Sequence, residues 1–313
     1  MSNAQQRVDW QGVFYFSFLA FSLAWLIAAP LWVWEEGLSH SYATWLIALM
    51  MFTPSVAALC MLYRVRPEPN KKRLLGWCWG NRRWKAFWIF AWLGIPIFSL
   101  AAPFVAANIG VYVLDLESFS GFKAILMQSG GQGALDMIAI EQLIGLQLLM
   151  MLVAPIINFI FCLGEELGWR GYLLPKLMPL GQWKAVLLSG VIWGLWHTPI
   201  ILLGHNYPDG GLLGVFMMVC MCTILGVILG WTRIATGSVW PAVIAHGSLN
   251  GSAGVVALFH LEGTTVDPLW VGWTGVTGWI LPLLFIGVLV MMGRFPVVGT
   301  RDGVLAEPNE AAN

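Results

Sequence analysis

Charged residues are scarce in this chain, where Asp, Glu, Lys and Arg together make up 10% of the 313 residues. A soluble domain of this length carries about a quarter charged residues, so the composition excludes an ordinary soluble protein. The apolar fraction is 58% and the mean hydropathy is +0.76. Several apolar windows exceed about 18 residues, the length that is needed to cross a bilayer. The sequence therefore predicts an all-α fold, a polytopic bundle of transmembrane helices.

Other absences narrow the class further. The formal net charge is zero, which gives the chain no general attraction for nucleic acid. The sequence lacks the short alternating segments that are typical of a transmembrane barrel. Its five cysteines do not form the two Cys-x2-Cys pairs of a structural zinc site. It contains neither His-Glu-x-x-His nor Gly-x-Ser-x-Gly, which argues against the common zinc and serine peptidases.

The long apolar runs predict about eight membrane-spanning helices. Their expected bounds are 13–34, 42–63, 86–107, 155–178, 185–203, 212–233, 238–259 and 270–293. The first run is too long for a signal-peptide core, and we expect it to remain as an anchor. The region 139–178 is too long for one crossing, so Pro155 is expected to divide it and to leave 139–154 as an interfacial or re-entrant helix.

The charges between these runs predict an orientation and a division of the chain. The segment 64–85 is rich in Lys and Arg, and such basic loops stay on the cytoplasmic side of a membrane. Alternating sides from this loop makes both termini cytoplasmic. Three parts are expected: N-terminal helices with the basic loop in 1–138, a catalytic core in 139–259, and a last helix with a tail in 260–313.

One apolar run contains ionisable residues that need an explanation. Glu165, Glu166 and Arg170 lie in a segment that we expect to be in the membrane, where each charge costs about 2.5–3.5 kcal/mol. On a helix, Glu166 and Arg170 are four residues apart and can form an ion pair. Glu165 points about 100° away from Glu166 and is left without a cationic partner on its own helix. A buried carboxylate of this kind is a candidate general base.

Two later runs contribute polar side chains at the same depth. His197 lies on one of them, and His246 and Asn250 lie four residues apart on one face of the other. At about 1.5 Å per residue, Glu165, His197 and His246 are each roughly 15–20 Å from the cytoplasmic ends of their helices. Residues that served separate packing roles would have no reason to coincide in depth, so we expect these groups to meet in one site.

The three motifs together resemble the CPBP family, which groups CAAX prenyl proteases of the Rce1 type with bacteriocin-processing and immunity proteins. The motifs are Glu165-Glu166-x-x-x-Arg170, then Trp193-x-x-x-His197, then His246-x-x-x-Asn250. They occur within residues 140–255, in the order and spacing of the family. Trp193 departs from the pattern, because the family usually has phenylalanine there; it still supplies an aromatic wall.

The resemblance implies an intramembrane endopeptidase that acts on a peptide or membrane-protein substrate. The compact chain suggests a prokaryotic host, so we expect the protein to lie in a prokaryotic inner membrane. Glu165 and His197 would activate a water, while His246 and Asn250 would form the oxyanion hole with neutral N–H donors. Glu166 and Arg170 would support the site. No cofactor is implied.

Other chemistries stay open. If a metal were bound, Glu165, His197 and His246 could hold zinc, as two histidines and a carboxylate do in some hydrolases. Cys162 and the core serines are weaker nucleophile candidates. A non-enzymatic immunity-type protein or a transporter would also place ionisable residues within the bilayer.

Overall fold

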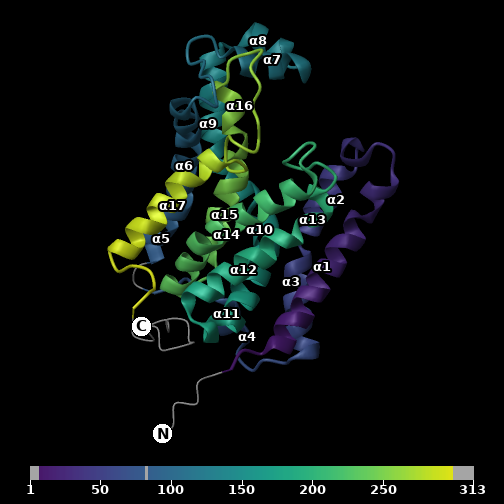
Figure 1. Cartoon of the computed structure of the whole chain (residues 1–313), viewed down its shortest axis with the longest axis vertical. Helices are drawn as coiled ribbons and strands as arrows, with labels where there is room; N and C mark the ends of the chain where they lie inside the picture. Colours follow the sequence, from purple (N-terminus) through teal and green to yellow (C-terminus); the bar gives the residue numbers. More distant parts are fainter. Residues whose placement is uncertain (1–6, 82–83, 299–313) are drawn as a thin grey trace.

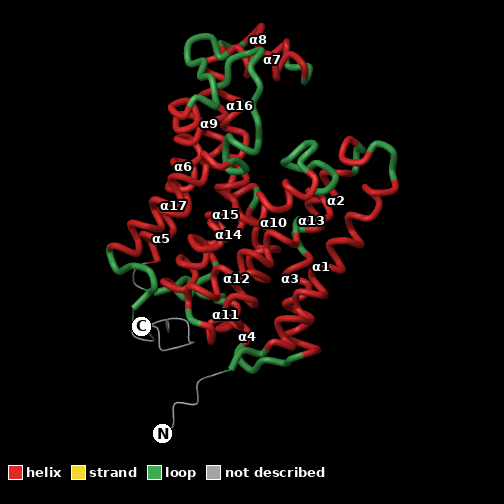
Figure 2. The backbone as a smooth tube through the Cα atoms, in the orientation of Figure 1, coloured by secondary structure: helices red, strands yellow, loops and turns green. Residues whose placement is uncertain are grey.

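The computed structural model describes residues 7–81 and 84–298, and the regular elements in these residues are helices (Figures 1 and 2). Arg82 and Arg83 of the predicted basic loop, and the tail from residue 299, lie outside the described residues. The N-terminal half contains α1 (Trp10–Val33), α2 (Ala43–Met50), α3 (Thr53–Cys60), α4 (Lys71–Leu75), α5 (Trp84–Ile89), α6 (Ile95–Ile109), α7 (Ser120–Gln128), α8 (Gln132–Met137) and α9 (Ile140–Ile157). The rest contains α10 (Phe159–Glu166), the π-helical segment η4 (Leu167–Leu173), α11 (Leu174–Leu177), α12 (Gln182–Trp196), α13 (Thr198–Ile201), α14 (Gly211–Thr236), α15 (Trp240–Ser252), α16 (Val256–Phe259) and α17 (Val276–Met291).

Six helical segments of the described chain are long and apolar enough to cross a membrane, which confirms a polytopic helical bundle. These segments are Trp10–Val33, Ala43–Val65, Trp84–Ile109, Ile140–Ile157, Gly211–Thr236 and Trp240–Phe259. The shorter Val276–Met291 is also apolar. Three predicted crossings, 155–178, 185–203 and 270–293, are largely helical but are not among the six. The first contains the ionisable residues and the irregular η4, the second is interrupted after Trp196, and the third contains the shorter α17.

The predicted division of the long region 139–178 is present, but it lies at Asn158, three residues after Pro155. Pro155 lies inside α9, and the chain first leaves the helix at Asn158, which separates α9 from α10. By length and composition, the 18 residues of α9 could cross a membrane, whereas we expected 139–154 to be an interfacial or re-entrant helix. The proline is in close contact with α15: a Cβ added to Gly247 would be 3.0 Å from Cα of Pro155.

The four helices around the site lie in the middle of the molecule. In Figure 1, α10, α12, α14 and α15 are flanked by α1 on one side and by α6 and α17 on the other. Close approach of α12 to α14 depends on Gly194, where an added Cβ would be 2.5 Å from Cα of Val219. Small residues at such contacts are the usual means by which membrane helices pack closely, since apolar side chains gain little from leaving lipid.

The described parts of both chain ends lie at the same end of the bundle as the basic segment. Arg66 donates a hydrogen bond to Gln11 just inside α1. Val297, beyond α17, exchanges hydrogen bonds with Gln182 at the start of α12. Figure 1 shows the start of α1, helix α4 and the end of α17 at the lower end of the molecule, and α7, α8 and α16 at the upper end.

The opposite end is closed by a loop built around Asp115. Its carboxylate accepts hydrogen bonds from the hydroxyls of Ser118 and Ser120, at 2.5 and 2.6 Å, and from both of their backbone N–H groups. These hydrogen bonds hold the pKa of Asp115 well below its usual range, so it stays ionised. A single β-bridge from Leu114 to His260 joins this loop to the segment after α16.

Candidate active site

The paired glutamates lie where one regular helix changes its winding. Glu165 and Glu166 end α10, and Arg170 lies in η4, whose hydrogen bonds follow the wider π-helical pattern. Turns of this kind inside helices are frequent at functional sites. All three side chains are buried, with exposed fractions of 2%, 0% and 1%. The ionisable residues of the first motif are thus enclosed by protein rather than facing lipid.

Glu166 has two cationic or potentially cationic partners. Arg170 Nη1 donates to Glu166 Oε1 at 2.8 Å, which confirms the predicted pair. His246 Nδ1 lies 2.9 Å from the same oxygen, so α15 is joined to the first motif. A buried guanidinium that is hydrogen-bonded to a carboxylate stabilises the ionised form of that carboxylate. We therefore assign the proton of this hydrogen bond to His246 Nδ1.

That assignment bears on the expected role of His246 as an oxyanion donor. A neutral imidazole whose proton is on Nδ1 has a lone pair at Nε2 and cannot donate from that atom. With this hydrogen bond in place, His246 could donate to an oxyanion from Nε2 only as an imidazolium, with a proton on each nitrogen. The oxyanion role of His246 stays a prediction.

Glu165 is held by two indoles. Its Oε2 accepts a hydrogen bond from Trp193 Nε1 at 2.7 Å and a longer one from Trp169 Nε1 at 3.3 Å. The expectation that Glu165 has no cationic partner on its own helix agrees with this arrangement, since its helix offers the Trp169 indole instead. The carboxylate is therefore fixed in place by neutral donors.

His197 follows directly on the end of α12 and is half-buried. Its Nδ1 lies 3.0 Å from the carbonyl oxygen of Trp193, which can only accept a hydrogen bond. The proton is therefore on Nδ1 in the neutral ring, and Nε2 presents a lone pair. A nitrogen in this state can accept a hydrogen bond from water and orient it. The ring of Trp196 packs edge-on against His197, with 4.8 Å between centroids.

Asn250 lies at the edge of this cluster. It is exposed, and its Nδ2 donates a weak hydrogen bond to Cys162 Sγ at 3.6 Å. Cys162 precedes Glu165 by one turn of α10, so Asn250 reaches the site through that helix. The structure brings Glu165, Glu166, Arg170 and His246 into one buried network and joins His197 to it through Trp193. It gives Asn250 a less direct connection, and the oxyanion role of Asn250 stays a prediction.

Two tryptophans are functional neighbours that sequence reasoning missed or undervalued. Trp193 was expected only as an aromatic wall, and Trp169 was given no role. Trp169 could have been found, because it is four residues after Glu165 and carries a donor on the same helix face. The hydrogen bond from Trp193 depends on the packing of α12 against α10, which no spacing rule predicts.

A buried arginine on α14 is hydrogen-bonded to the backbone of the first motif. Arg233, near the end of α14, is fully buried. Its Nε donates to the backbone oxygen of Arg170 at 3.1 Å, and its Nη2 donates to the backbone oxygen of Leu74 at 2.9 Å. One side chain thus connects η4 with α4 of the basic segment.

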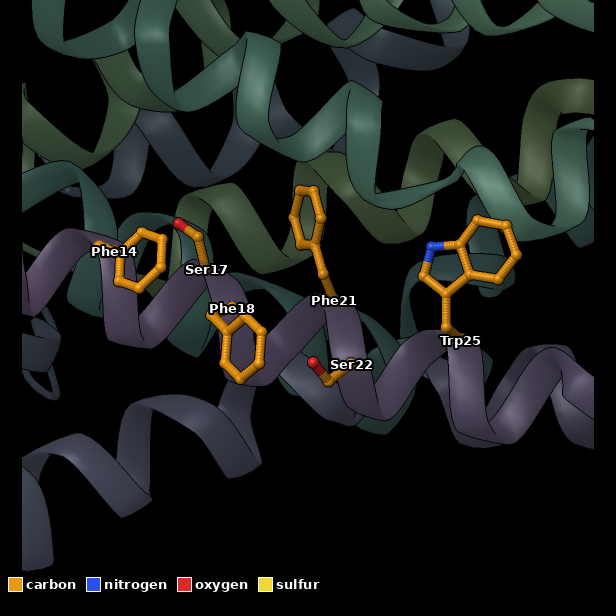
Figure 3. Close-up of a pocket in the computed structure, with 6 residues that line it drawn as sticks. All are labelled: Phe14, Ser17, Phe18, Phe21, Ser22 and Trp25. Atoms are coloured by element: carbon orange, nitrogen blue, oxygen red, sulfur yellow. The ribbon is translucent and has the colours of Figure 1, made fainter.

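A surface groove on α1 lies outside the polar cluster. Figure 3 shows its lining, which comes from one helix and carries no ionisable group. The lining residues are Phe14, Ser17, Phe18, Phe21, Ser22 and Trp25. Phe16, on another face of the same helix, packs against Trp169 with 5.6 Å between ring centroids. The groove is therefore separate from the polar cluster, against which α1 packs through Phe16.

The described side chains do not gather into a set of metal ligands. Across residues 7–81 and 84–298, no three His, Cys, Asp or Glu side chains are grouped so that they could hold one. Glu165 Oε2 and His246 Nδ1, which zinc could have used, are both engaged in hydrogen bonds. Zinc binding by Glu165, His197 and His246 remains a prediction that needs an experiment.

The fold and the site define a polytopic helical membrane protein with a buried glutamate, histidine and arginine cluster. Residues 143–252 match the family model described as type II CAAX prenyl endopeptidase Rce1-like. A relative from Methanococcus maripaludis, "CAAX prenyl protease 2", is 46% identical over 103 residues. That alignment covers 30% of this chain and 37% of the relative's length. These matches confirm the resemblance that the three motifs predict, and the family-model match covers the helices that carry the site.

Proposed function

We propose that this chain is an intramembrane endopeptidase that hydrolyses a peptide bond with a water activated by Glu165 and His197. One observation carries the proposal. Trp193 donates to Glu165 with its side chain and accepts from His197 with its backbone, so the two water-activating residues are held together. This buried link lies within the segment that is similar to CAAX prenyl endopeptidases.

The chemistry follows from the protonation states. His197 Nε2 accepts a hydrogen bond from the water. The water oxygen attacks the peptide carbonyl carbon while Glu165 takes a proton from the water. The tetrahedral oxyanion forms beside His246, as imidazolium, and Asn250. A donor of this type contributes about 2.7–4 kcal/mol in a dry site. Glu165 then passes its proton to the leaving nitrogen as the carbon–nitrogen bond breaks.

The substrate is proposed to be the exposed tail of a membrane-bound peptide or protein. The relative is named for CAAX substrates, so a peptide that ends in Cys-a-a-X is the first probe. We further propose that the chain lies in a prokaryotic inner membrane with both termini in the cytoplasm, because the basic segment around α4 is at their end of the bundle.

The decisive test removes the carboxylate. Glu165→Ala is expected to abolish cleavage of quenched fluorogenic Cys-a-a-X peptides, farnesylated and unmodified, by the purified protein, because no base is left for the water. Glu141→Ala, at an exposed position of α9, serves as the matched control and should retain activity. Comparison of membrane-protein termini in cells that express wild type or Glu165→Ala would reveal natural substrates.

The same assay decides between the alternatives. A Glu165→Ala protein that cleaves as fast as wild type rules out Glu165 as the base. Activity that is lost on chelation and restored by zinc alone supports the metal mechanism. If neither assay detects Glu165-dependent cleavage, and vesicles show solute flux that depends on these residues, a transporter is favoured.

A further inference from the structure

Trp193 is in contact with four ionisable residues of the site, which are Glu165, Arg170, His197 and His246. Besides its hydrogen bonds to Glu165 and His197, its ring lies under Arg170, with 4.3 Å from the guanidinium carbon to the ring centroid. The ring of His246 packs edge-on against it at 5.3 Å. Trp193 is 2% exposed, so these contacts leave the indole little freedom to rotate.

The two oxygens of Glu165 have different surroundings. Oε2 accepts both indole N–H groups, at 2.7 and 3.3 Å. Within the part of the chain that the structure describes, no hydrogen bond is formed by Oε1. An oxygen that already accepts two donors has little capacity left for a water proton. Oε1 is therefore the atom of Glu165 that is free to receive it.

We propose that Trp193 is a positioning residue: its indole N–H fixes Oε2 of Glu165, presents Oε1 to the water, and favours the ionised carboxylate. The inference rests on the proposed function and goes beyond it, because a phenylalanine at this position would supply the wall without the N–H. Trp169 adds a second, longer hydrogen bond to the same oxygen.

The test is Trp193→Phe, which removes the N–H and keeps an aromatic ring. A hydrogen bond to a charged group is strong enough that kcat/KM should fall about ten- to hundredfold, mainly through kcat, since no substrate contact is lost. The acidic limb of the pH–activity profile should move about one unit to higher pH, because the carboxylate loses its shortest donor. Trp169→Phe should also lower kcat/KM and move the acidic limb to higher pH, but by smaller amounts.

The matched control is Trp231→Phe. Trp231 is also buried, and its indole donates to the backbone oxygen of Arg294, outside the site. This variant should leave the pH profile unchanged. A Trp193→Phe protein with the wild-type profile and wild-type kcat would overturn the proposal.

Other ionisable groups near Glu165 could also change the pH–activity profile. They are Cys162, Glu166 and Arg170 on its own segment, His197 at the end of α12, Cys222 on α14 and His246 on α15. A shift caused by any of these groups would not require the indole N–H of Trp193. A second readout therefore follows the indole itself.

That readout is the indole N–H resonance of Trp193 in protein with 15N-labelled tryptophan, in detergent micelles. The resonance is assigned as the signal that is missing from Trp193→Phe or Trp193→Tyr, whichever folds. It should move in Glu165→Gln, while that of Trp231 stays in place. If the Trp193 resonance is the same with Glu165 and Gln, the hydrogen bond does not exist and the proposal fails. Absence of peptide cleavage by wild type, with a normal resonance shift, would instead refute only the proposed function.

Discussion

At the scale of single residues, the site combines one shared ion cluster with one carboxylate held by neutral donors. Glu166 is hydrogen-bonded to both Arg170 and His246, whereas Glu165 accepts hydrogen bonds from two indoles. The two neighbouring glutamates therefore do different work. Glu166 balances buried positive charge, whereas Glu165, the proposed proton acceptor, forms no ion pair among the described residues.

The charge-balancing role predicts a large loss of stability in Glu166→Gln. The substitution leaves the buried Arg170 guanidinium without a counterion on its hydrogen bond, which costs about 3–5 kcal/mol when a buried pair loses one partner. Thermal unfolding in detergent, followed by circular dichroism, should show a clear decrease in the melting temperature.

The control for this prediction is Glu68→Gln. Glu68 pairs with Lys176, but both side chains are partly exposed, at 29% and 17%. Such a pair contributes about 0–1 kcal/mol, so its removal should hardly change the melting temperature. Equal melting temperatures for Glu166→Gln and wild type would contradict the assigned role of Glu166.

The residues of the motifs could be predicted from the sequence, but their hydrogen bonds could not. Charge in an apolar run and i, i+4 spacing were sufficient to find Glu165, Glu166, Arg170, His197 and His246. The direction of the Trp193 indole and the proton position on His246 depend on which side chains face each other across helices. That information is absent from the spacing within any single helix.

At the scale of helices, the position of the site depends on how closely α12 approaches α14. Gly194 lies one position after Trp193 and has the backbone of Val219 against it. A larger residue at this contact would push α12 away from α14 and change the angle at which Trp193 and His197 enter the site.

We therefore expect Gly194→Val to destabilise the protein by about 1–3 kcal/mol, the usual cost of overpacking, and to lower peptidase activity. Gly287→Val is the control, since an added Cβ there meets nothing within 4 Å. Melting curves and cleavage rates of the two variants check the prediction. A Gly194→Val protein with the stability and activity of the control would show that the close approach is not needed.

Helix existence was predictable from hydropathy, whereas helix ends were not. Proline inside a helix is disfavoured because it lacks an N–H, yet α9 continues through Pro155. Gly247 of α15 lies against Pro155, and this contact between helices cannot be predicted from a single run of sequence. Five of the eight predicted crossings are among the six candidate spans. The segments that carry Glu165 and His197 are interrupted and α17 is short, while α9 is a sixth span that was not predicted as a crossing.

At the scale of the whole molecule, the two ends of the bundle differ in charge and in construction. Arg66, Lys72 and Lys176 lie at the end that holds α4, while Asp115 and Glu262 lie at the end that holds α7. This asymmetry is the basis of the proposed orientation.

The orientation predicts which side reacts with a maleimide that cannot cross membranes. In intact bacterial cells, with the native chain as the blank, Glu262→Cys should be labelled from outside, and Lys72→Cys should be labelled only after the membrane is opened. Both positions are exposed in the structure, so a lack of labelling reflects the membrane rather than burial. Labelling of Lys72→Cys in intact cells would reverse the orientation.

Arg233 connects two segments that are far apart in the sequence. Its one guanidinium group spans the backbone of Leu74, at the bilayer surface in the proposed orientation, and the backbone of Arg170, at the centre of the charge cluster. A displacement of α4 relative to η4 would therefore strain these two hydrogen bonds, so the position of α4 is coupled to the backbone that carries Arg170.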